Sequence, residues 1–155
     1  MEFVLAGPDA TAALGAQIAA GLAVGDAVAL EGDLGAGKTT LARAILAALG
    51  LDETVPSPTF TLVQHYETAK MAVAHFDLYR LEQEADIDEL GLDEALADGA
   101  ALIEWPERAG KRLPPDSLHV QLAIMSNCTR HVRVRGPLRW SKFLAHLAQQ
   151  GAPAA

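Results

Sequence analysis

The segment from Gly32 to Thr39 carries the most specific chemical pattern in the chain. It reads Gly-Asp-Leu-Gly-Ala-Gly-Lys-Thr and matches the phosphate-binding pattern G-x-x-x-x-G-K-[ST] without a departure. Glycines let the backbone curl so that successive N–H groups point at a phosphate, which a Cβ would obstruct. Lys38 would bring a positive charge to the β- and γ-phosphates, and the Thr39 hydroxyl would bind Mg²⁺. The pattern therefore predicts a site for a nucleoside triphosphate and Mg²⁺.

A phosphate-binding loop also needs an acid on a neighbouring strand to complete the metal shell. Glu104 follows the apolar run 100–103 and is the best-placed candidate, with an exposed strand-end glutamate as the alternative interpretation. Asp77, which ends the run 73–76, is the rival. A strand-end aspartate beside a phosphate can bind the metal through water or orient the attacking water, and the residues leave both roles open.

Three further features near these acids have a functional and an ordinary interpretation. The hydroxyl-rich loop 57–61 suits a switch that senses the γ-phosphate, but as a bare pattern it favours a plain turn. Trp105 could cover the nucleotide or belong to the core. His75 has no cysteine or histidine partner at metal-ligand spacing, so we interpret it as structural.

The elements around the loop fit the motif. The apolar run 27–30 predicts a strand buried on both faces of a parallel sheet. From Lys38 onward, apolar residues at helical spacing predict a helix, and Gly50 stands where a C-cap glycine belongs. Strand, glycine loop and helix in this order are the context that the phosphate-binding motif requires.

The rest of the chain predicts further helices and strands. An early helix contains Leu14, Ile18 and Leu22, with Asp9 or Thr11 as its cap and Gly21 and Gly25 at its end. The other expected elements are a hairpin over 61–67 and 71–77, a buried strand over 100–103 and strands over 118–125 and 131–135. The acidic segment 81–98 favours one or two surface helices over a specific docking patch. A closing helix contains Trp140, Phe143, Leu144 and Leu147. We expect an α/β fold of the P-loop NTPase class, with a mixed, partly antiparallel sheet flanked by helices. Residues 1–150 would form a single domain, and 151–155 a frayed tail.

Composition restricts the function further. The chain has 155 residues and a formal net charge of -8, which disfavours a protein that holds DNA or RNA by itself. Its one cysteine, Cys128, fits a reducing cytoplasmic setting, and no apolar stretch approaches the roughly 20 residues of a membrane helix. Five basic residues cluster late in the chain and could reach a nucleotide, a partner or RNA, although a solvated face is at least as plausible: Arg130, Arg133, Arg135, Arg139 and Lys142.

Four segments together resemble the TsaE family, also called YjeE: 32–40, 57–63, 75–81 and 103–106. The first is the generic loop; the other three, Ser-Pro-Thr-Phe-Thr-Leu-Val, His-Phe-Asp-Leu-Tyr-Arg-Leu and Ile-Glu-Trp-Pro, are specific in this order and spacing. The similarity runs from about Thr11 to the last strand and weakens after Arg130. It implies a small bacterial P-loop ATPase that works with TsaD and TsaB in making N6-threonylcarbamoyladenosine in tRNA, with tRNA reached through the complex.

The resemblance also implies roles for individual residues. It places ATP on Gly35, Ala36, Gly37, Lys38, Thr39 and Thr40, with Arg130 near the base. Mg²⁺ would be held by Thr39 and Glu104, and Asp77 and Trp105 would be needed for turnover together with Lys38. Thr59 would lie in a switch-like loop, and the region of Pro8 and Asp9 would border the adenine.

Three other functions remain possible for this loop. A small-molecule or nucleoside kinase would use the same motif, with Arg108, Lys111 and Arg112 as a basic lid. A regulatory GTPase is disfavoured, because the only asparagine, Asn127, precedes Cys128 and cannot begin Asn-Lys-x-Asp. An interaction module with a degenerate loop is disfavoured by the intact Lys38, Thr39 and Glu104.

Overall fold

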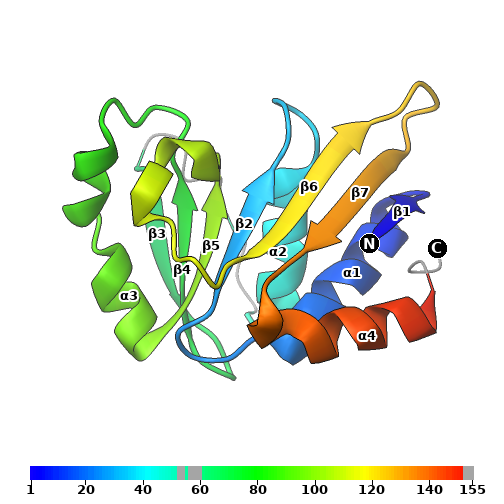
Figure 1. Cartoon of the computed structure of the whole chain (residues 1–155), viewed down its shortest axis with the longest axis horizontal. Helices are drawn as coiled ribbons and strands as arrows, with labels where there is room; N and C mark the ends of the chain where they lie inside the picture. Colours follow the sequence, from blue (N-terminus) through cyan, green and yellow to red (C-terminus); the bar gives the residue numbers. More distant parts are fainter. Residues whose placement is uncertain (52–54, 56–60, 152–155) are drawn as a thin grey trace.

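Seven strands form one mixed sheet in the computed structural model, which describes residues 1–51, 55 and 61–151 (Figure 1). The order across the sheet is β1-β7-β6-β2-β5-β4-β3. The strands are β1 (Glu2–Leu5), β2 (Ala27–Glu31), β3 (Val63–Glu67), β4 (Ala72–Asp77), β5 (Gly99–Glu104), β6 (Leu118–Ile124) and β7 (Arg130–Arg135).

The centre of the sheet is parallel and its edges are antiparallel. Strand β2 pairs in parallel with β5 on one side and β6 on the other, and β4 pairs in parallel with β5. The antiparallel pairs are β3 with β4, β6 with β7 and β1 with β7. The predicted mixed sheet is therefore confirmed, and so is the hairpin of β3 and β4.

Helices cover both faces of this sheet. Helices α1 (Pro8–Gly21), α2 (Lys38–Ala48) and α4 (Ser141–Gln150) share one hydrophobic core with one face of the strands. The short helix α3 (Leu92–Asp98) and the 3-10 turn η1 (Glu84–Asp88) pack with the opposite face, at the β3–β4–β5 end in Figure 1. The described residues also form three more 3-10 turns: η2 (Pro106–Arg108), η3 (Gly110–Arg112) and η4 (Leu138–Trp140).

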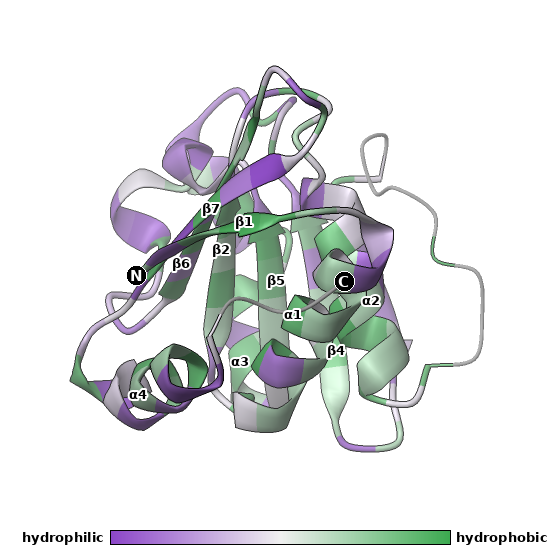
Figure 2. Cartoon of the chain, turned by 90° about the vertical axis from the view of Figure 1, so that its right-hand side faces the viewer, coloured by the Kyte–Doolittle hydropathy of each residue, from purple (hydrophilic) through white to green (hydrophobic). Residues whose placement is uncertain are grey.

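Alternation along the central strands explains these two cores. In β2, Val28 and Leu30 belong to the core under α1 and α2, while Ala27 belongs to the core on the α3 side. Leu102 and Ile103 of β5 divide in the same way. Successive strand side chains point to opposite faces, so a strand covered on both faces must be apolar throughout. Figure 2 shows this hydrophobic colouring along β2 and β5.

The ends of the first two helices follow different rules. The predicted cap of α1 is wrong: the helix begins at Pro8 after Gly7, with no side-chain cap, and Asp9 and Thr11 lie inside it. Proline suits a first helical position because an N–H at that position would have no acceptor within the helix, so its absence costs no hydrogen bond. The predicted end of α2 is confirmed, since Gly50 has a φ of 97° and its N–H donates to Ala47 O at 3.0 Å.

Strand β1 was not among the expected elements. It pairs with β7 along Glu2↔Arg133 to Leu5↔Arg130 and closes that edge of the sheet. Only Phe3 and Leu5 of its side chains are buried, which gives a strand signal too short to recognise in the sequence. None of the described helices is long and apolar enough to cross a membrane. Residues 152–155 of the expected tail lie outside the described part of the chain.

Candidate active site

The phosphate-binding loop connects the end of β2 to the start of α2. Gly32 and Gly37 have φ values of 145° and 109°, a region that side chains rarely adopt. A Cβ on Gly32 would also collide with the carbonyl oxygen of Leu122 on β6. Only glycine therefore fits at Gly32, and the loop delivers the chain to Lys38 as the first residue of α2. The N–H groups at this helix start carry the positive end of the helix dipole.

Lys38 points back into the loop. Its Nζ donates hydrogen bonds to the carbonyl oxygens of Gly32 and Asp33, at 2.6 and 3.0 Å. Burial lowers the pKa of Lys38 from its ordinary value, and the carboxylates of Glu104 and Asp77 oppose that effect. An anion placed beside Nζ would favour the protonated amine further, so phosphate binding and the charge of Lys38 support each other.

Glu104 lies buried at the end of β5, and its side chain faces the start of α2. The Thr39 hydroxyl donates to Glu104 Oε1 at 2.7 Å. A hydroxyl that gives its proton to a carboxylate keeps its lone pairs for a cation. His75 Nε2 lies 2.6 Å from the other carboxylate oxygen, Oε2. The two ends of the Glu104 carboxylate are thus held by α2 and by β4.

Asp77 is the direct neighbour of Glu104 in the sheet. The parallel register of β4 and β5 pairs Asp77 with Glu104, so both carboxylates leave the strands at the same level. Asp77 is buried, and its Oδ1 accepts the backbone N–H of Tyr79 at 3.1 Å. The structure therefore brings the two acids that the sequence offered as rivals into one site.

Trp105 closes this site from above Lys38. Its backbone has a φ of 58°, which is unusual for a large side chain and turns the ring back from the strand end. The Lys38 Nζ lies 4.2 Å from the centroid of the Trp105 ring, within the range of a cation–π contact. The Tyr79 ring packs against Trp105 with a centroid distance of 4.9 Å. The Trp105 ring thus forms a partly exposed wall beside the lysine, and Tyr79 packs against that ring.

Two of the cavities that border the loop share part of their walls. One, of about 240 Å³, is lined by the expected phosphate and metal residues: Leu34, Gly35, Gly37, Lys38, Thr39, Thr40, Asp77, Glu104 and Trp105. The second, of about 310 Å³, extends toward the start of α1 and includes Pro8, Ala36, Cys128 and Arg130 in its wall. Both include Gly37 and Thr40. Asp9 does not line either cavity, whereas its neighbour Pro8 does.

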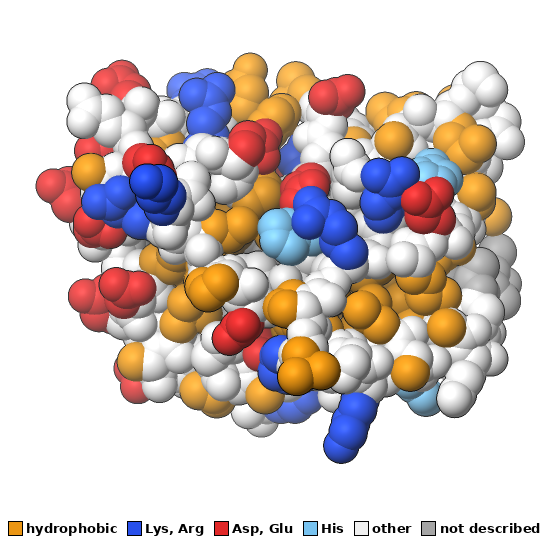
Figure 3. Space-filling view, viewed as in Figure 1, with side chains coloured by type: hydrophobic (Ala, Val, Ile, Leu, Met, Phe, Trp, Pro, Cys, Tyr) orange, Lys and Arg blue, Asp and Glu red, His pale blue; other side chains and the backbone are white. Residues whose placement is uncertain are grey.

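Arg130 reaches the loop from β7. Its Nε donates to the carbonyl oxygen of Ala36 at 2.8 Å, and Nη1 donates to that of Cys128 at 2.7 Å. The other late arginines form ion pairs: Arg133 with Glu2, Arg135 with Glu31 and Arg139 with Asp26. On the face drawn in Figure 3, basic side chains are interspersed with acidic ones, while acidic side chains gather at the edge near α3.

Some expected site residues lie elsewhere or outside the described chain. Arg108, Lys111 and Arg112 line neither of the cavities at the loop, and Arg112 pairs with Asp88 at 3.0 Å. Residues 57–60 of the expected switch loop, Thr59 included, are not among the described residues. Tyr79 was not among the expected site residues, although its place two residues after Asp77 in a dense motif was a usable signal.

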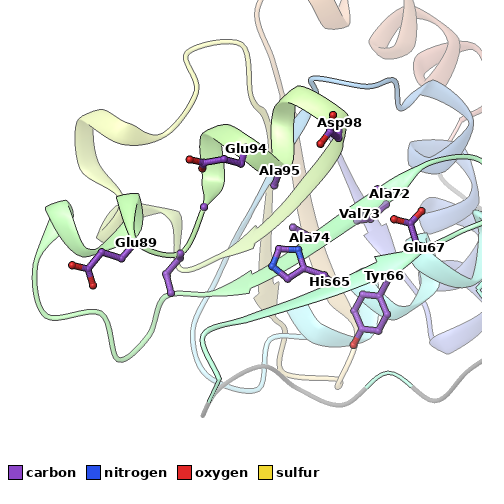
Figure 4. Close-up of a pocket in the computed structure, with 12 residues that line it drawn as sticks. His65, Tyr66, Glu67, Ala72, Val73, Ala74, Glu89, Glu94, Ala95 and Asp98 are labelled. Carbon is purple, nitrogen blue, oxygen red and sulfur yellow. The ribbon is translucent and has the colours of Figure 1, made fainter.

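A further cavity lies away from the loop, between the β3–β4 hairpin and α3 (Figure 4). It has a volume of about 410 Å³, and its wall includes Tyr66 and the acidic side chains Glu67, Glu89, Glu94 and Asp98. None of the predicted site residues lines it.

Comparison with known proteins shows the family to which the chain is similar. The model of the family described as "Threonylcarbamoyl adenosine biosynthesis protein TsaE" matches residues 5–132. The chain is 40% identical to the tRNA threonylcarbamoyladenosine biosynthesis protein TsaE of Bacillus subtilis over 126 residues, which is 81% of this chain and 78% of that protein. It is 39% identical to the Rickettsia felis protein of the same name over 128 residues, covering 82% and 75% of the two chains.

A solved structure has the same fold. The crystal structure of YdiB from Bacillus subtilis superposes with a TM-score of 0.79 and 28% sequence identity, covering 97% of this chain and 95% of that one.

Proposed function

The chain belongs to the TsaE family, which acts in the biosynthesis of threonylcarbamoyladenosine in tRNA, and on that premise we propose that it binds Mg·ATP at the Gly32–Thr39 loop and hydrolyses it. We further propose that it turns over slowly alone and faster in a complex with TsaD and TsaB. ATP hydrolysis would then drive a conformational step of that machinery, while the chemistry on tRNA belongs to a partner.

One observation carries this proposal: the Thr39 hydroxyl lies 2.7 Å from Glu104 Oε1, in the same cavity as Lys38. Lys38 and Thr39 begin helix α2, whereas Glu104 ends β5, the strand beside β2. Their convergence supports a metal–phosphate site over a loop that retains the motif without its chemistry.

The residues present fit Mg·ATP. Gly35 and Gly37 have φ values of 80° and 109°, and a Cβ on Gly35 would meet nothing within 4 Å, so the loop backbone is open to phosphates at this point. The oxygen donors Thr39 and Glu104, with Asp77 beside them, are the ligand type that Mg²⁺ prefers. The second cavity, next to Pro8 and Arg130, offers a mostly apolar space of the kind that a base occupies.

The proposed reaction divides the work among the chain's own residues. Lys38 leaves the loop carbonyls and neutralises the β- and γ-phosphates, and the loop N–H groups orient them. Glu104 and Thr39 would hold Mg²⁺, which would supply positive charge beside the phosphate oxygens. Asp77 would orient the attacking water. Trp105 shields the lysine from solvent, which strengthens its interaction with the phosphates.

The cationic side chains at the site support a role for partners. Among the described residues that line the two cavities, Lys38 and Arg130 are the cations, and Arg130 lies at the base end. A second cation at the γ-phosphate end would have to come from outside, and such a group accelerates phosphoryl transfer by about 10³- to 10⁵-fold where it has been measured.

Phosphate release from ATP tests the proposal. We expect slow release by the chain alone and a marked rise when a TsaB–TsaD complex is added. A parallel screen for phosphorylated nucleosides and sugars tests the kinase alternative. Transfer of the γ-phosphoryl group to a small acceptor, or fast release that partners do not change, would contradict the proposed function.

A further inference from the structure

His75 is a fully buried polar side chain whose imidazole lies behind the Glu104 carboxylate. Its exposed fraction is 0%, and its Nε2 is 2.6 Å from Glu104 Oε2. Thr39 Oγ1 holds the other carboxylate oxygen at 2.7 Å. We propose that His75 is a positioning residue: it fixes the Glu104 carboxylate in the orientation that binds Mg²⁺ with the nucleotide. This role rests on the proposed function.

The sheet register produces the contact. Parallel pairing sets Asp77 opposite Glu104 and His75 opposite Leu102. Side chains two residues apart in a strand share a face, so His75, Asp77 and Glu104 all point toward the α2 side of the sheet. His75 precedes Asp77, the register partner of Glu104, by two residues, so it is the diagonal neighbour of Glu104 on the adjacent strand. The contact is therefore built into the strands rather than into a loop.

The hydrogen-bond chemistry of His75 points to Glu104 alone. A carboxylate offers only acceptors, so Nε2 must carry the hydrogen that joins the two groups. The opposite ring nitrogen, Nδ1, is buried with no hydrogen-bond partner among the described residues. In that part of the chain, no group of three or more His, Cys, Asp and Glu side chains is arranged to hold a metal ion. Among the described residues, the imidazole thus has one hydrogen-bond partner, the Oε2 atom of Glu104.

A purely structural role explains this arrangement poorly. An apolar ring would fill the same interior space without burying a nitrogen that has no partner in the described part of the chain, and burying such a polar atom is unfavourable. The presence of a polar ring at this position is explained if Glu104 Oε2 needs a hydrogen-bond donor. Without one, the buried carboxylate would turn toward solvent or toward another donor, and the Thr39–Glu104 pair would lose its geometry.

Two substitutions separate positioning from packing. In His75→Gln the side-chain amide nitrogen can take the place of Nε2 and donate to Glu104. In His75→Asn it can reach only the place of Nδ1, so the donor is lost although the chemical group is the same. Each variant is compared with the wild type by calorimetric titration of ATP, once with Mg²⁺ and once with EDTA.

The expected result is specific to Mg²⁺. Contacts of this indirect kind change metal affinity or activity by roughly 10- to 100-fold. In His75→Asn, the gain in ATP affinity that Mg²⁺ provides should fall by that factor, while the affinity in EDTA should stay at the wild-type value. His75→Gln should recover most of the gain. In a Glu104→Gln background, His75→Asn should add no further loss, because both changes remove the same contact.

Three outcomes would overturn the positioning role: equal losses with Mg²⁺ and with EDTA in His75→Asn, no recovery in His75→Gln, or additive losses with Glu104→Gln. Failure of the wild-type protein to bind ATP in either buffer would instead overturn the proposed function and this role with it. If the variants do not fold, nitrogen-15 spectra of the wild-type imidazole still decide. We expect the hydrogen on Nε2, and a hydrogen on Nδ1 alone would contradict the proposal.

Discussion

The two carboxylates at the ends of β4 and β5 have different contacts, which suggests different roles. Glu104 accepts the hydroxyl of Thr39, the expected metal ligand, whereas Asp77 is tied to the backbone of Tyr79. We predict that Glu104→Gln retains ATP binding better than hydrolysis. Comparable deletions of charge at a reacting centre lower kcat by about 10²- to 10³-fold, because the lost interaction is strongest in the transition state.

Phosphate release and equilibrium binding of ATP, measured on the same samples, check this prediction. Asp77→Asn is the matched control, since it also replaces a carboxylate with an amide at the neighbouring strand end. Normal turnover in Glu104→Gln together with an inactive Asp77→Asn would reverse the two assignments.

Trp105 gives a second prediction at the level of the single residue. Its ring lies over the Lys38 ammonium, and contacts of this type contribute about 0.5 to 2 kcal/mol. Trp105→Ala should therefore raise the KM for Mg·ATP by roughly 2- to 30-fold, and it should abolish the acceleration by TsaB–TsaD. Trp105→Phe keeps an aromatic face, so its KM and its acceleration by the partners should lie between those of the wild type and Trp105→Ala. Steady-state kinetics with and without the partners provide the readout, and wild-type KM and acceleration in Trp105→Ala would exclude this role of the ring.

Among the elements, the packing of α1 on α2 depends on a small residue. A Cβ on Gly15 of α1 would lie 2.6 Å from the Cβ of Ala44 and 2.9 Å from its carbonyl carbon on α2. Overpacking of this kind costs about 1 to 3 kcal/mol. Gly15→Ala should thus lower the Tm by roughly 2 to 12 °C for a domain of this size.

Thermal unfolding of Gly15→Ala beside Ala16→Ser tests this contact. Ala16 is exposed on the same helix, so the added atom there meets solvent and should leave the Tm nearly unchanged. An unchanged Tm in Gly15→Ala would mean that the two helices separate without cost.

Elements with a local signal were predictable from the sequence. Strands β2 and β5 are apolar on both faces, and α2 has both a helical face and a terminal glycine, so each carries its own pattern. Strand β1 could not be recognised because its few residues gain their partner from β7, far along the chain. Likewise, the hydrogen bond from His75 to Glu104 depends on the register of β4 and β5, which no sequence pattern specifies.

At the scale of the whole molecule, charge limits what the chain binds alone. The net charge is -8, and Arg133, Arg135 and Arg139 are each paired with a carboxylate. Binding to a phosphate backbone depends on free cations that can release counterions. We therefore predict that the isolated chain does not retain tRNA in filter binding at about 0.15 M salt, whereas a TsaB–TsaD complex does. Retention of tRNA by the chain alone would contradict this.

Stabilisation by Mg·ATP tests the central claim, that the Gly32–Thr39 loop is a nucleotide site, most directly. A ligand that binds only the folded protein stabilises it by about 2.7 kcal/mol at 100 times its Kd. For a domain of this size, that corresponds to a rise in Tm of roughly 5 to 10 °C. Thermal unfolding of the wild type should show this rise, and Lys38→Ala, which leaves the phosphate charge uncompensated, should show little of it. No rise in the wild type, or an equal rise in Lys38→Ala, would contradict the account.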